Sequence, residues 1–382
     1  MSSPRGGHDA SLDGLRGLAI LLVIVAHTVR FSPQNSGWQL INAVTEAGWI
    51  GVDLFFVLSG FLITRILLET RDDPHRVSNF YARRALRILP AYIVYLGLVF
   101  LVLAFTAGNG RLDEARTWLL SHLLFMQNLH SAAIAEQPIR EMSHLWSLAV
   151  EEQFYLLWPW LVWSFRTALL SRLCLVVIGL AWTSKVALVY AGAWHHTIYI
   201  LPFTRMDGFA IGALIAAQWH LGMLAGSTRL SPVFWLLLMA LGALFLLCES
   251  PARLNAWQVA LATTLSVLMF GVGLKNVLLS TEQNAMRQIL SWGWLRFLGR
   301  YSYGLYLLHF GVDTWVRLFM QPLLADLVQG QWLRLLTTTV SMGLSLLLAL
   351  LLHRWVEAPA LALKKHFAAS PTSAQRGLAE TI

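Results

Sequence analysis

The run LDGLRGLAILLVIVAHTV, residues 12–29, decides the class of fold. It is apolar over the length of a membrane-crossing helix, which needs roughly 20 residues for a hydrocarbon core about 30 Å thick. Three ionisable side chains, Asp13, Arg16 and His27, nevertheless lie inside it. A charged group in such a helix costs free energy unless it has a partner or a function. The run therefore predicts a membrane helix that carries functional groups.

The composition extends this prediction to the whole chain. Of the 382 residues, 57% are hydrophobic and only 13% are charged, about half the charge of a typical soluble domain. These values exclude a water-soluble enzyme and a disordered chain. The two cysteines, Cys174 and Cys248, lie far apart and are too few for a disulfide framework or a cysteine-type metal site. We expect no bound metal and no redox chemistry.

Ten apolar stretches are candidates for crossing the bilayer. They cover residues 12–29, 49–68, 89–107, 145–165, 169–190, 206–219, 233–248, 257–274, 303–319 and 335–352. The sequence therefore predicts an all-α, polytopic membrane protein with about ten transmembrane helices.

The distribution of Lys and Arg predicts how these helices are oriented. Residues 31–48 and 191–204 contain neither, whereas the loop between the second and third stretches is rich in arginine. Its arginines are Arg65, Arg71, Arg76, Arg83, Arg84 and Arg87. Because cytoplasmic loops are enriched in Lys and Arg, we expect this loop and both termini to be cytoplasmic. The net charge of +8 is spread along loop edges, so we expect the lipid bilayer as a partner and no nucleic acid.

This orientation sorts the polar residues of the spans into two sets. The outer half holds His27, Asp53, Ser147, Glu151, Arg205 and Asp207, and the inner edge holds Arg16, Arg83, Arg84 and Arg87. Arg16 and His27 are 11 residues apart, so they share a helix face about 16 Å apart along the axis. The outer set offers a base with carboxylates that could orient it, and the inner set offers guanidinium groups suited to phosphate.

Two further polar stripes follow helical spacing. Tyr155 shares a face with Ser147 and Glu151 in the fourth stretch. The ninth stretch carries the stripe Ser302, Tyr306, His309, Asp313 and Arg317.

Structural interpretations stand beside these functional ones. His27 could be a buried histidine bonded to a backbone carbonyl, and Arg84 and Arg87 could be ordinary cytoplasmic anchors. Arg205 and Asp207 could form an intramembrane ion pair. The stripe of the ninth stretch could be a hydrogen-bonded seam between helices.

Six runs of the sequence resemble acyltransferase family 3, the bacterial integral-membrane O-acyltransferases. The runs are LDGLRGLAILLVIVAH (12–27), GVDLFFVLSGFLIT (51–64), FYARRALRILPAY (80–92), HLWSLAVEEQFYLLWP (144–159), TRMDGFAIGALIA (204–216) and LGRYSYGLYLLHF (298–310). They stand in the order of the family and cover nearly the whole chain.

The resemblance implies a membrane domain of roughly ten helices, expected over residues 1–360. The chain after Pro359 contains Lys364, Lys365 and a final run rich in Ser, Thr and Ala, which predicts a cytoplasmic tail at 361–382. Such a domain takes an acyl group, commonly acetyl, from cytoplasmic acyl-CoA and passes it to a hydroxyl of a carbohydrate or similar acceptor. Acyl-CoA is then a co-substrate and no cofactor is held permanently. The expected location is the bacterial plasma (inner) membrane. Some members carry a further C-terminal esterase-like domain, and we expect this chain to be the membrane part alone.

The resemblance also implies roles for individual residues. The family's Arg-x10-His pattern falls on Arg16 and His27, with the histidine catalytic. Its Arg-x-x-Arg pattern falls on Arg84 and Arg87, which would bind the donor. The position of Arg16 and Arg83 at the same inner edge makes them further candidates for donor binding. Its Gly-Val-Asp and Trp-Ser-Leu-x-x-Glu patterns fall on Asp53 and Glu151, either of which could align His27. The residues expected to contact the acceptor or to serve a structural role are Ser147, Tyr155, Arg205, Asp207, Tyr306 and His309.

Two functions from another class remain as alternatives. A secondary transporter or a lipid-linked sugar flippase would also place His, Asp, Glu and Arg along an intramembrane path. Neither would need the Arg-x-x-Arg loop, and the sequence contains no visible inverted repeat.

Overall fold

The computed structural model describes residues 9–29, 36–106, 109–226, 230–248, 254–325 and 328–367. Within these ranges the chain is helical and contains no strand. Ten helices coincide with the ten predicted stretches: α1 (Ala10–Thr28), α3 (Gly51–Glu69), α4 (Arg76–Thr106), α8 (Trp146–Ser164), α9 (Thr167–Tyr190), α11 (Pro202–His220), α12 (Pro232–Leu247), α13 (Ala256–Leu279), α16 (Ser302–Trp315) and α18 (Gly330–Leu352). The all-α fold of a multi-pass membrane protein is thereby confirmed.

Shorter helices connect the long ones. They are α2 (Ser36–Glu46), α5 (Asn109–Leu123), α6 (Gln127–Ile134), α7 (Arg140–Ser143), α10 (His195–Ile200), α14 (Ala285–Leu290), α15 (Gly293–Arg300), α17 (Gln321–Ala325) and α19 (Ala358–Ala362). The predicted tail begins at the end of α19 and continues as a 3-10 turn, Leu363–Phe367, that packs against α4. Residues 368–382 of the tail lie outside the described residues.

The number of spans stays a prediction. Among the described residues, 7 helical segments are long and apolar enough to cross a membrane. Three predicted spans are not among them: α8 contains the polar run Glu151–Gln153, and α12 has only 16 residues. The third, α16, continues through a π-helical turn into α17, and this segment contains the polar side chains of His309, Asp313 and Arg317. A helix as short as α12 reaches across a bilayer only where it thins or where neighbouring helices cover its ends.

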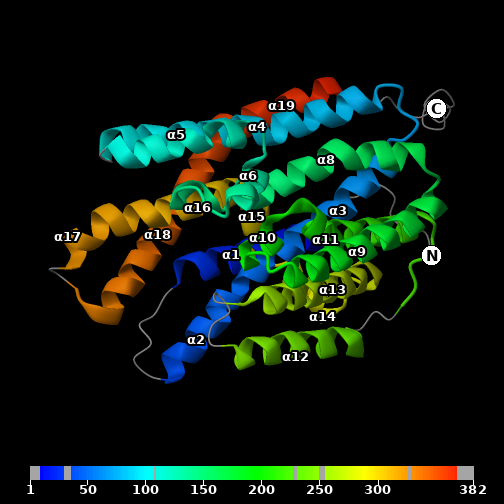
Figure 1. Cartoon of the computed structure of the whole chain (residues 1–382). Helices are drawn as coiled ribbons and strands as arrows, with labels where there is room; N and C mark the ends of the chain where they lie inside the picture. The colour runs from blue at the N-terminus through cyan, green and yellow to red at the C-terminus, as the bar shows by residue number, and fades with distance from the viewer. Residues whose placement is uncertain are drawn as a thin grey trace.

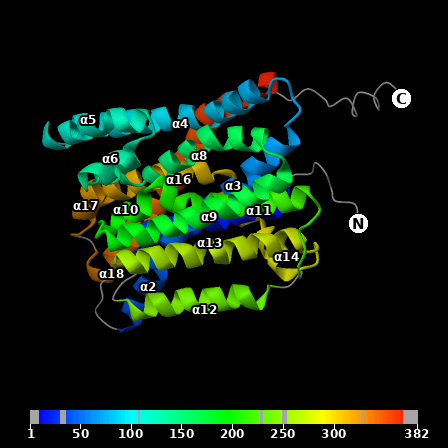
Figure 2. The same cartoon turned by 45° about the vertical axis from the view of Figure 1, so that its right-hand side comes forward.

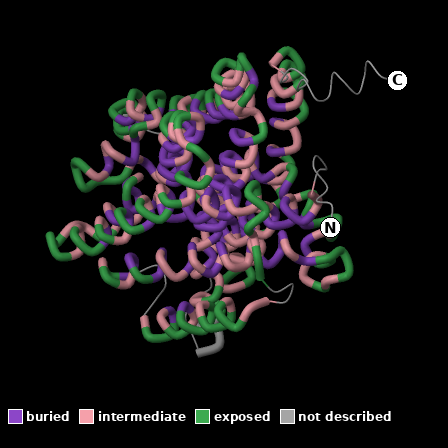
Figure 3. The backbone as a smooth tube through the Cα atoms, turned by 90° about the vertical axis from the view of Figure 1, so that its right-hand side faces the viewer, coloured by how far each residue is buried: buried purple, intermediate pink, exposed green. Residues whose placement is uncertain are grey.

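The long helices run side by side in one bundle (Figure 1). In Figure 2, α4 and α5 lie along one side of the bundle and α12 lies along the opposite side. Buried residues gather in the middle of the bundle, and exposed ones lie on its periphery (Figure 3). In the segment His195–His220, which contains α11, 78% of the apolar window is buried, against 22% for α9. Helix α11 is therefore central, and α9 presents apolar side chains such as Leu180 outward, as a lipid-facing helix does.

Two glycines let α3 and α11 approach backbone to backbone. A Cβ atom on Gly60 would lie 2.0 Å from the carbonyl oxygen of Phe209, and one on Gly212 would lie 2.0 Å from that of Val57. Small residues at such crossings allow close packing in membranes. The contact fixes α3 against α11 and brings Asp53 of α3 opposite Arg205 of α11.

Candidate active site

The histidine predicted to be catalytic meets a second histidine. His27, near the end of α1, has its Nδ1 2.9 Å from Nε2 of His309 on α16. The Nδ1 atom of His309 lies 2.7 Å from the carbonyl oxygen of Tyr306 and 3.1 Å from that of Leu305. Because a carbonyl only accepts hydrogen bonds, Nδ1 of His309 carries the proton and its Nε2 accepts. His27 therefore donates through Nδ1, and its own Nε2 holds the basic lone pair.

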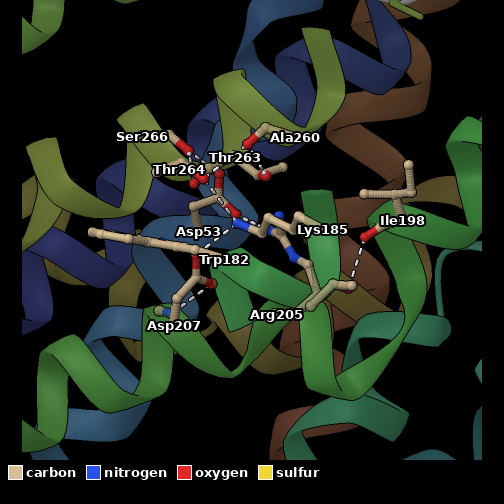
Figure 4. A network of polar contacts seen from close by, with 12 residues as sticks. Asp53, Trp182, Lys185, Ile198, Arg205, Asp207, Ala260, Thr263, Thr264 and Ser266 are labelled. Atoms are coloured by element: carbon tan, nitrogen blue, oxygen red, sulfur yellow. Dashed lines mark hydrogen bonds and ion pairs between the residues drawn. The ribbon is translucent and has the colours of Figure 1, made fainter. Parts of the chain in front are cut away.

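The two predicted carboxylate partners of His27 lie with other groups. Asp53 forms an ion pair with Arg205 and accepts a hydrogen bond from Ser266 (Figure 4). Glu151 accepts a hydrogen bond of 2.5 Å from Ser59, and Tyr155 also donates to it. The imidazole neighbour that the structure gives to His27 is His309, from the stripe of the ninth stretch.

Four buried charges form a cluster between α3, α9, α11 and α13, shown in Figure 4. Besides the pair of Asp53 and Arg205, Nζ of Lys185 lies 2.6 Å from Oδ2 of Asp207 and 3.2 Å from Oγ1 of Thr264. The four charged side chains are at most 2% exposed. Two positive and two negative charges compensate one another here, as a buried ion network requires.

The ion pair suggested between Arg205 and Asp207 is absent from this cluster. Residues two positions apart on a helix point about 200° apart, so these two cannot face each other. Arg205 pairs instead with Asp53, and Asp207 pairs with Lys185. Each residue ties α11 to a different neighbour, which indicates a structural role for the cluster.

Most of the predicted donor-binding arginines line one cavity, which has a volume of about 160 Å³. Arg16 from α1 and Arg84 and Arg87 from α4 line it, and Glu151 lies on its wall. The guanidinium carbon of Arg84 is 5.3 Å from the centre of the Tyr155 ring, so the ring supports that side chain. The predicted arginine Arg83 lies outside this cavity and lines a neighbouring one.

A second cavity, of about 300 Å³, contains His27. Its wall includes the aromatic residues Trp49, Trp146 and Tyr199. Val52 and Tyr306 line both cavities, so the two cavities lie next to each other at these residues. At this junction the hydroxyls of Ser147 and Tyr306 are 2.6 Å apart. Helix α1 thus contributes Arg16 to the first cavity and His27 to the second.

Comparison with known proteins now identifies the family. The sequence profile of the family described as acyltransferase domain matches residues 9–354. This chain belongs to the acyltransferase 3 family. The family and the enzyme class predicted from the sequence, an acyltransferase for groups other than aminoacyl groups, are confirmed, and neither the transporter nor the flippase is favoured.

Several curated proteins are similar to the chain over most of its length. It is 30% identical over 376 residues to the peptidoglycan O-acetyltransferase OatA of Listeria monocytogenes, covering 91% of the chain and 55% of that protein. It is 30% identical over 324 residues to the putative peptidoglycan O-acetyltransferase YrhL of Bacillus subtilis, covering 79% of the chain and 48% of that protein. A putative O-acetyltransferase of Staphylococcus aureus is 26% identical over 374 residues, covering 91% and 56%. The chain spans about half the length of these relatives, and no solved structure matches it.

The second cavity contains, besides His27, three histidines that were not predicted as site residues: His144, His195 and His196. His144 stands between α7 and α8, is buried, and has its ring centre 5.3 Å from that of His309. Burial holds the pKa of His144 well below its usual range, and the nearby His309 and His27 lower it further. Among the described residues, no group of three or more His, Cys, Asp or Glu is arranged to hold a metal ion.

The aromatic wall of the second cavity was also missed. Trp49 and Tyr199 contact edge to face with ring centres 5.3 Å apart, and Trp146 lies 4.7 Å from Tyr199. In a membrane protein such residues near helix ends are usually assigned to the interfacial belt. Only the packing of α10 against α8, together with the contact of Tyr199 with Trp49 in the 3-10 turn Ala47–Ile50, distinguishes these three from belt residues.

Proposed function

We propose that this acyltransferase moves an acetyl group from acyl-CoA, bound at the cytoplasmic face of the plasma membrane, to a hydroxyl of peptidoglycan or a similar glycan outside the cell. The observation that carries the proposal is the adjacency of two cavities, one lined by three arginines and the other containing His27. The names of the relatives, which are O-acetyltransferases, support acetyl as the acyl group. Both termini are then cytoplasmic.

The first cavity suits the donor. Arg16, Arg84 and Arg87 would hold the phosphates, because planar guanidinium groups bind phosphate oxygens two at a time. A pantetheine arm has about 13 bonds between its phosphate and its sulfur, and at about 1.2 Å of advance per bond it reaches about 15 Å. This reach matches the separation of about 16 Å along α1 between Arg16 and His27. A donor held by its phosphates at one end therefore brings its thioester to the histidine.

The second cavity suits a glycan. Flat aromatic rings offer a surface on which a sugar ring can lie, and Trp49, Trp146 and Tyr199 supply three of them. His196 and Gln137 on the same wall provide polar groups for sugar hydroxyls. An apolar pocket with a few directed polar groups is the usual form of a small-molecule site.

The chemistry follows from the tautomer of His27. Its Nε2 removes the proton from the acceptor hydroxyl while the hydroxyl oxygen attacks the carbonyl carbon of the thioester. The C–S bond then breaks, and the imidazolium of His27 returns the proton to the departing thiolate of CoA. Base catalysis of this kind contributes about 10² to 10⁴ in rate. His309 accepts the hydrogen bond from Nδ1 and holds the ring in this tautomer, which makes it a positioning residue.

The test uses the purified protein in nanodiscs with isotopically labelled acetyl-CoA and soluble peptidoglycan fragments. We expect mass spectrometry to find one labelled acetyl group on a glycan hydroxyl, and none with His27→Ala. Intact-protein mass after incubation with the donor alone distinguishes direct transfer, which leaves the protein unmodified, from a covalent intermediate. Absence of transfer to any hydroxyl acceptor, with donor and folded protein present, would contradict the proposal.

The sidedness has its own test. Single cysteines at Asp73 and Ala193 are introduced into a chain that lacks the two native cysteines. In intact cells an impermeant thiol reagent should label position 193 and leave position 73 unlabelled. The reverse pattern would place the arginine-lined cavity outside and overturn the proposed orientation.

A further inference from the structure

A third cavity adjoins the arginine-lined one at its end. It has a volume of about 250 Å³ and shares Ile66 and Arg84 with the first cavity. Its remaining walls include Arg76 and Arg83 from α4. They also include Lys364, from the 3-10 turn after α19. Figure 1 shows α19 lying alongside α4, which is how the end of the described chain reaches this place.

The third cavity carries more positive charge than its neighbours neutralise. Its one carboxylate, Asp73, accepts hydrogen bonds of 2.9 Å from the backbone amide of His75 and from the side-chain amide of Asn79. Within the described part of the chain, no carboxylate oxygen lies within 4.0 Å of a nitrogen of Arg83, Arg84 or Lys364. Cations gathered around a cavity without paired carboxylates repel one another unless an anion joins them.

The arrangement along α4 places these cations in two successive positions. Arg76, Arg83 and Arg87 recur at i, i+7 and i+11 and therefore share one helix face, with Arg84 beside it. Arg87 lines the first cavity, Arg83 lines the third, and Arg84 lines both. One ligand with two separate anionic groups fits this division.

We propose that Lys364, together with Arg83 and Arg76, binds the 3′-phosphate of the donor nucleotide. This inference rests on the proposed function, since it assigns the outer part of the same donor. Coenzyme A carries a pyrophosphate next to its pantetheine arm and a separate phosphomonoester on its ribose. With the pyrophosphate held by Arg84 and Arg87, the phosphomonoester lies beyond Arg84, in the third cavity. At about −1.5 to −2 near pH 7, it matches a site of several uncompensated cations.

Lys364 and the arginines contribute differently. An arginine can bind two phosphate oxygens in its plane, whereas a lysine is a compact point charge on a flexible stem. Arg76 already donates to the carbonyl oxygen of Arg71 at 2.7 Å, which fixes its position. Lys364 comes from outside α4, so its removal leaves that helix intact. It is therefore the residue whose substitution reports on the ligand without disturbing the first cavity.

The test compares CoA with 3′-dephospho-CoA. Affinities of the full chain, in nanodiscs of neutral phosphatidylcholine, are measured by isothermal titration calorimetry. We expect the unmodified protein to bind CoA at least about tenfold more tightly than dephospho-CoA, the size of one charge-assisted hydrogen bond to phosphate. Lys364→Ala should lose most of this preference by weakening the binding of CoA alone, and Lys364→Arg should retain it.

The matched control is Lys365→Ala. Lys365 is the next residue, is exposed and does not line the cavity, so its loss should leave the preference for CoA unchanged. Equal affinity of the unmodified protein for CoA and dephospho-CoA would overturn the inference and leave the proposed function standing. A full preference for CoA over dephospho-CoA in Lys364→Ala would likewise overturn the inference and leave the proposed function standing. No binding of either nucleotide would overturn the proposed function itself, and the inference with it.

A phosphate of an anionic lipid is the other source of the same chemistry. The titrations are therefore repeated in nanodiscs that contain phosphatidylglycerol. If the added lipid abolishes the preference for CoA in the unmodified protein but Lys364→Ala has no effect in neutral nanodiscs, the cavity holds a lipid headgroup. That result would overturn the assignment to the donor.

Discussion

Replacing His309 tests how the acyltransferase site orients its base. In His309→Ala, Nδ1–H of His27 loses the acceptor that lies 2.9 Å away. His27 is half-buried, and the loss of the hydrogen-bond partner of such a group costs about 1 to 3 kcal/mol. The loss destabilises the tautomer and the ring position of His27 that catalysis needs, so kcat should drop by about 10- to 100-fold. The KM for acyl-CoA should change little, because His309 lines neither arginine-lined cavity.

A conservative variant separates positioning from packing. The side-chain oxygen of glutamine can take the place of Nε2 of His309 and accept from His27, so His309→Gln should recover part of the lost kcat. Labelled transfer at saturating donor measures both variants, after size-exclusion chromatography has established that they fold. Near-normal kcat for His309→Ala would show that His309 does not position His27. So would a folded His309→Gln that is no more active than the alanine variant.

Three further outcomes follow from the geometry. In steady-state kinetics in nanodiscs, Arg84→Ala should mainly raise the KM for acyl-CoA, about tenfold or more, while His27→Ala should mainly lower kcat. A change of the same constant in both variants would contradict this division of roles. Asp53→Asn leaves the charge of Arg205 buried and unpaired, so it should lower the free energy of unfolding by about 3 to 5 kcal/mol. Asp113→Asn, in an ion pair whose side chains are 62% exposed, should have almost no effect in the same denaturation assay. Gly212→Ala should destabilise the fold by about 1 to 3 kcal/mol, and unchanged stability would show that α3 and α11 do not approach as closely as described.

The sequence predicts the helices and their polar faces well, because both follow from the local periodicity of the chain. The spacing of Arg16 and His27 placed them on one face of one helix, and the structure puts that helix across two adjoining cavities. The arginines of α4 likewise follow from their spacing, although Arg83 lines a different cavity from Arg84 and Arg87.

The partners of these side chains were not predictable in the same way. Asp53 lies with Arg205 because Gly60 and Gly212 let α3 and α11 touch, and a single sequence does not reveal which helices pack together. The neighbour of His27 is His309 on α16, far along the chain. The i, i+4 spacing of His309 and Asp313 predicts that these two share a helix face, but it does not predict that His309 contacts His27. Lys364 lies in the predicted tail, where a basic residue is usually a solvated anchor.

The most direct test of the central claim is transfer across a sealed membrane. Proteoliposomes are prepared with one orientation of the acyltransferase, labelled acetyl-CoA is supplied only on the side of α4's arginine-rich end, and peptidoglycan fragments are enclosed on the other side. We expect labelled acetyl groups on the enclosed glycan, dependent on His27, with CoA released on the side where the donor was added. Labelling only of glycan that shares a compartment with the donor would contradict a path that runs from the arginines through the bundle to His27.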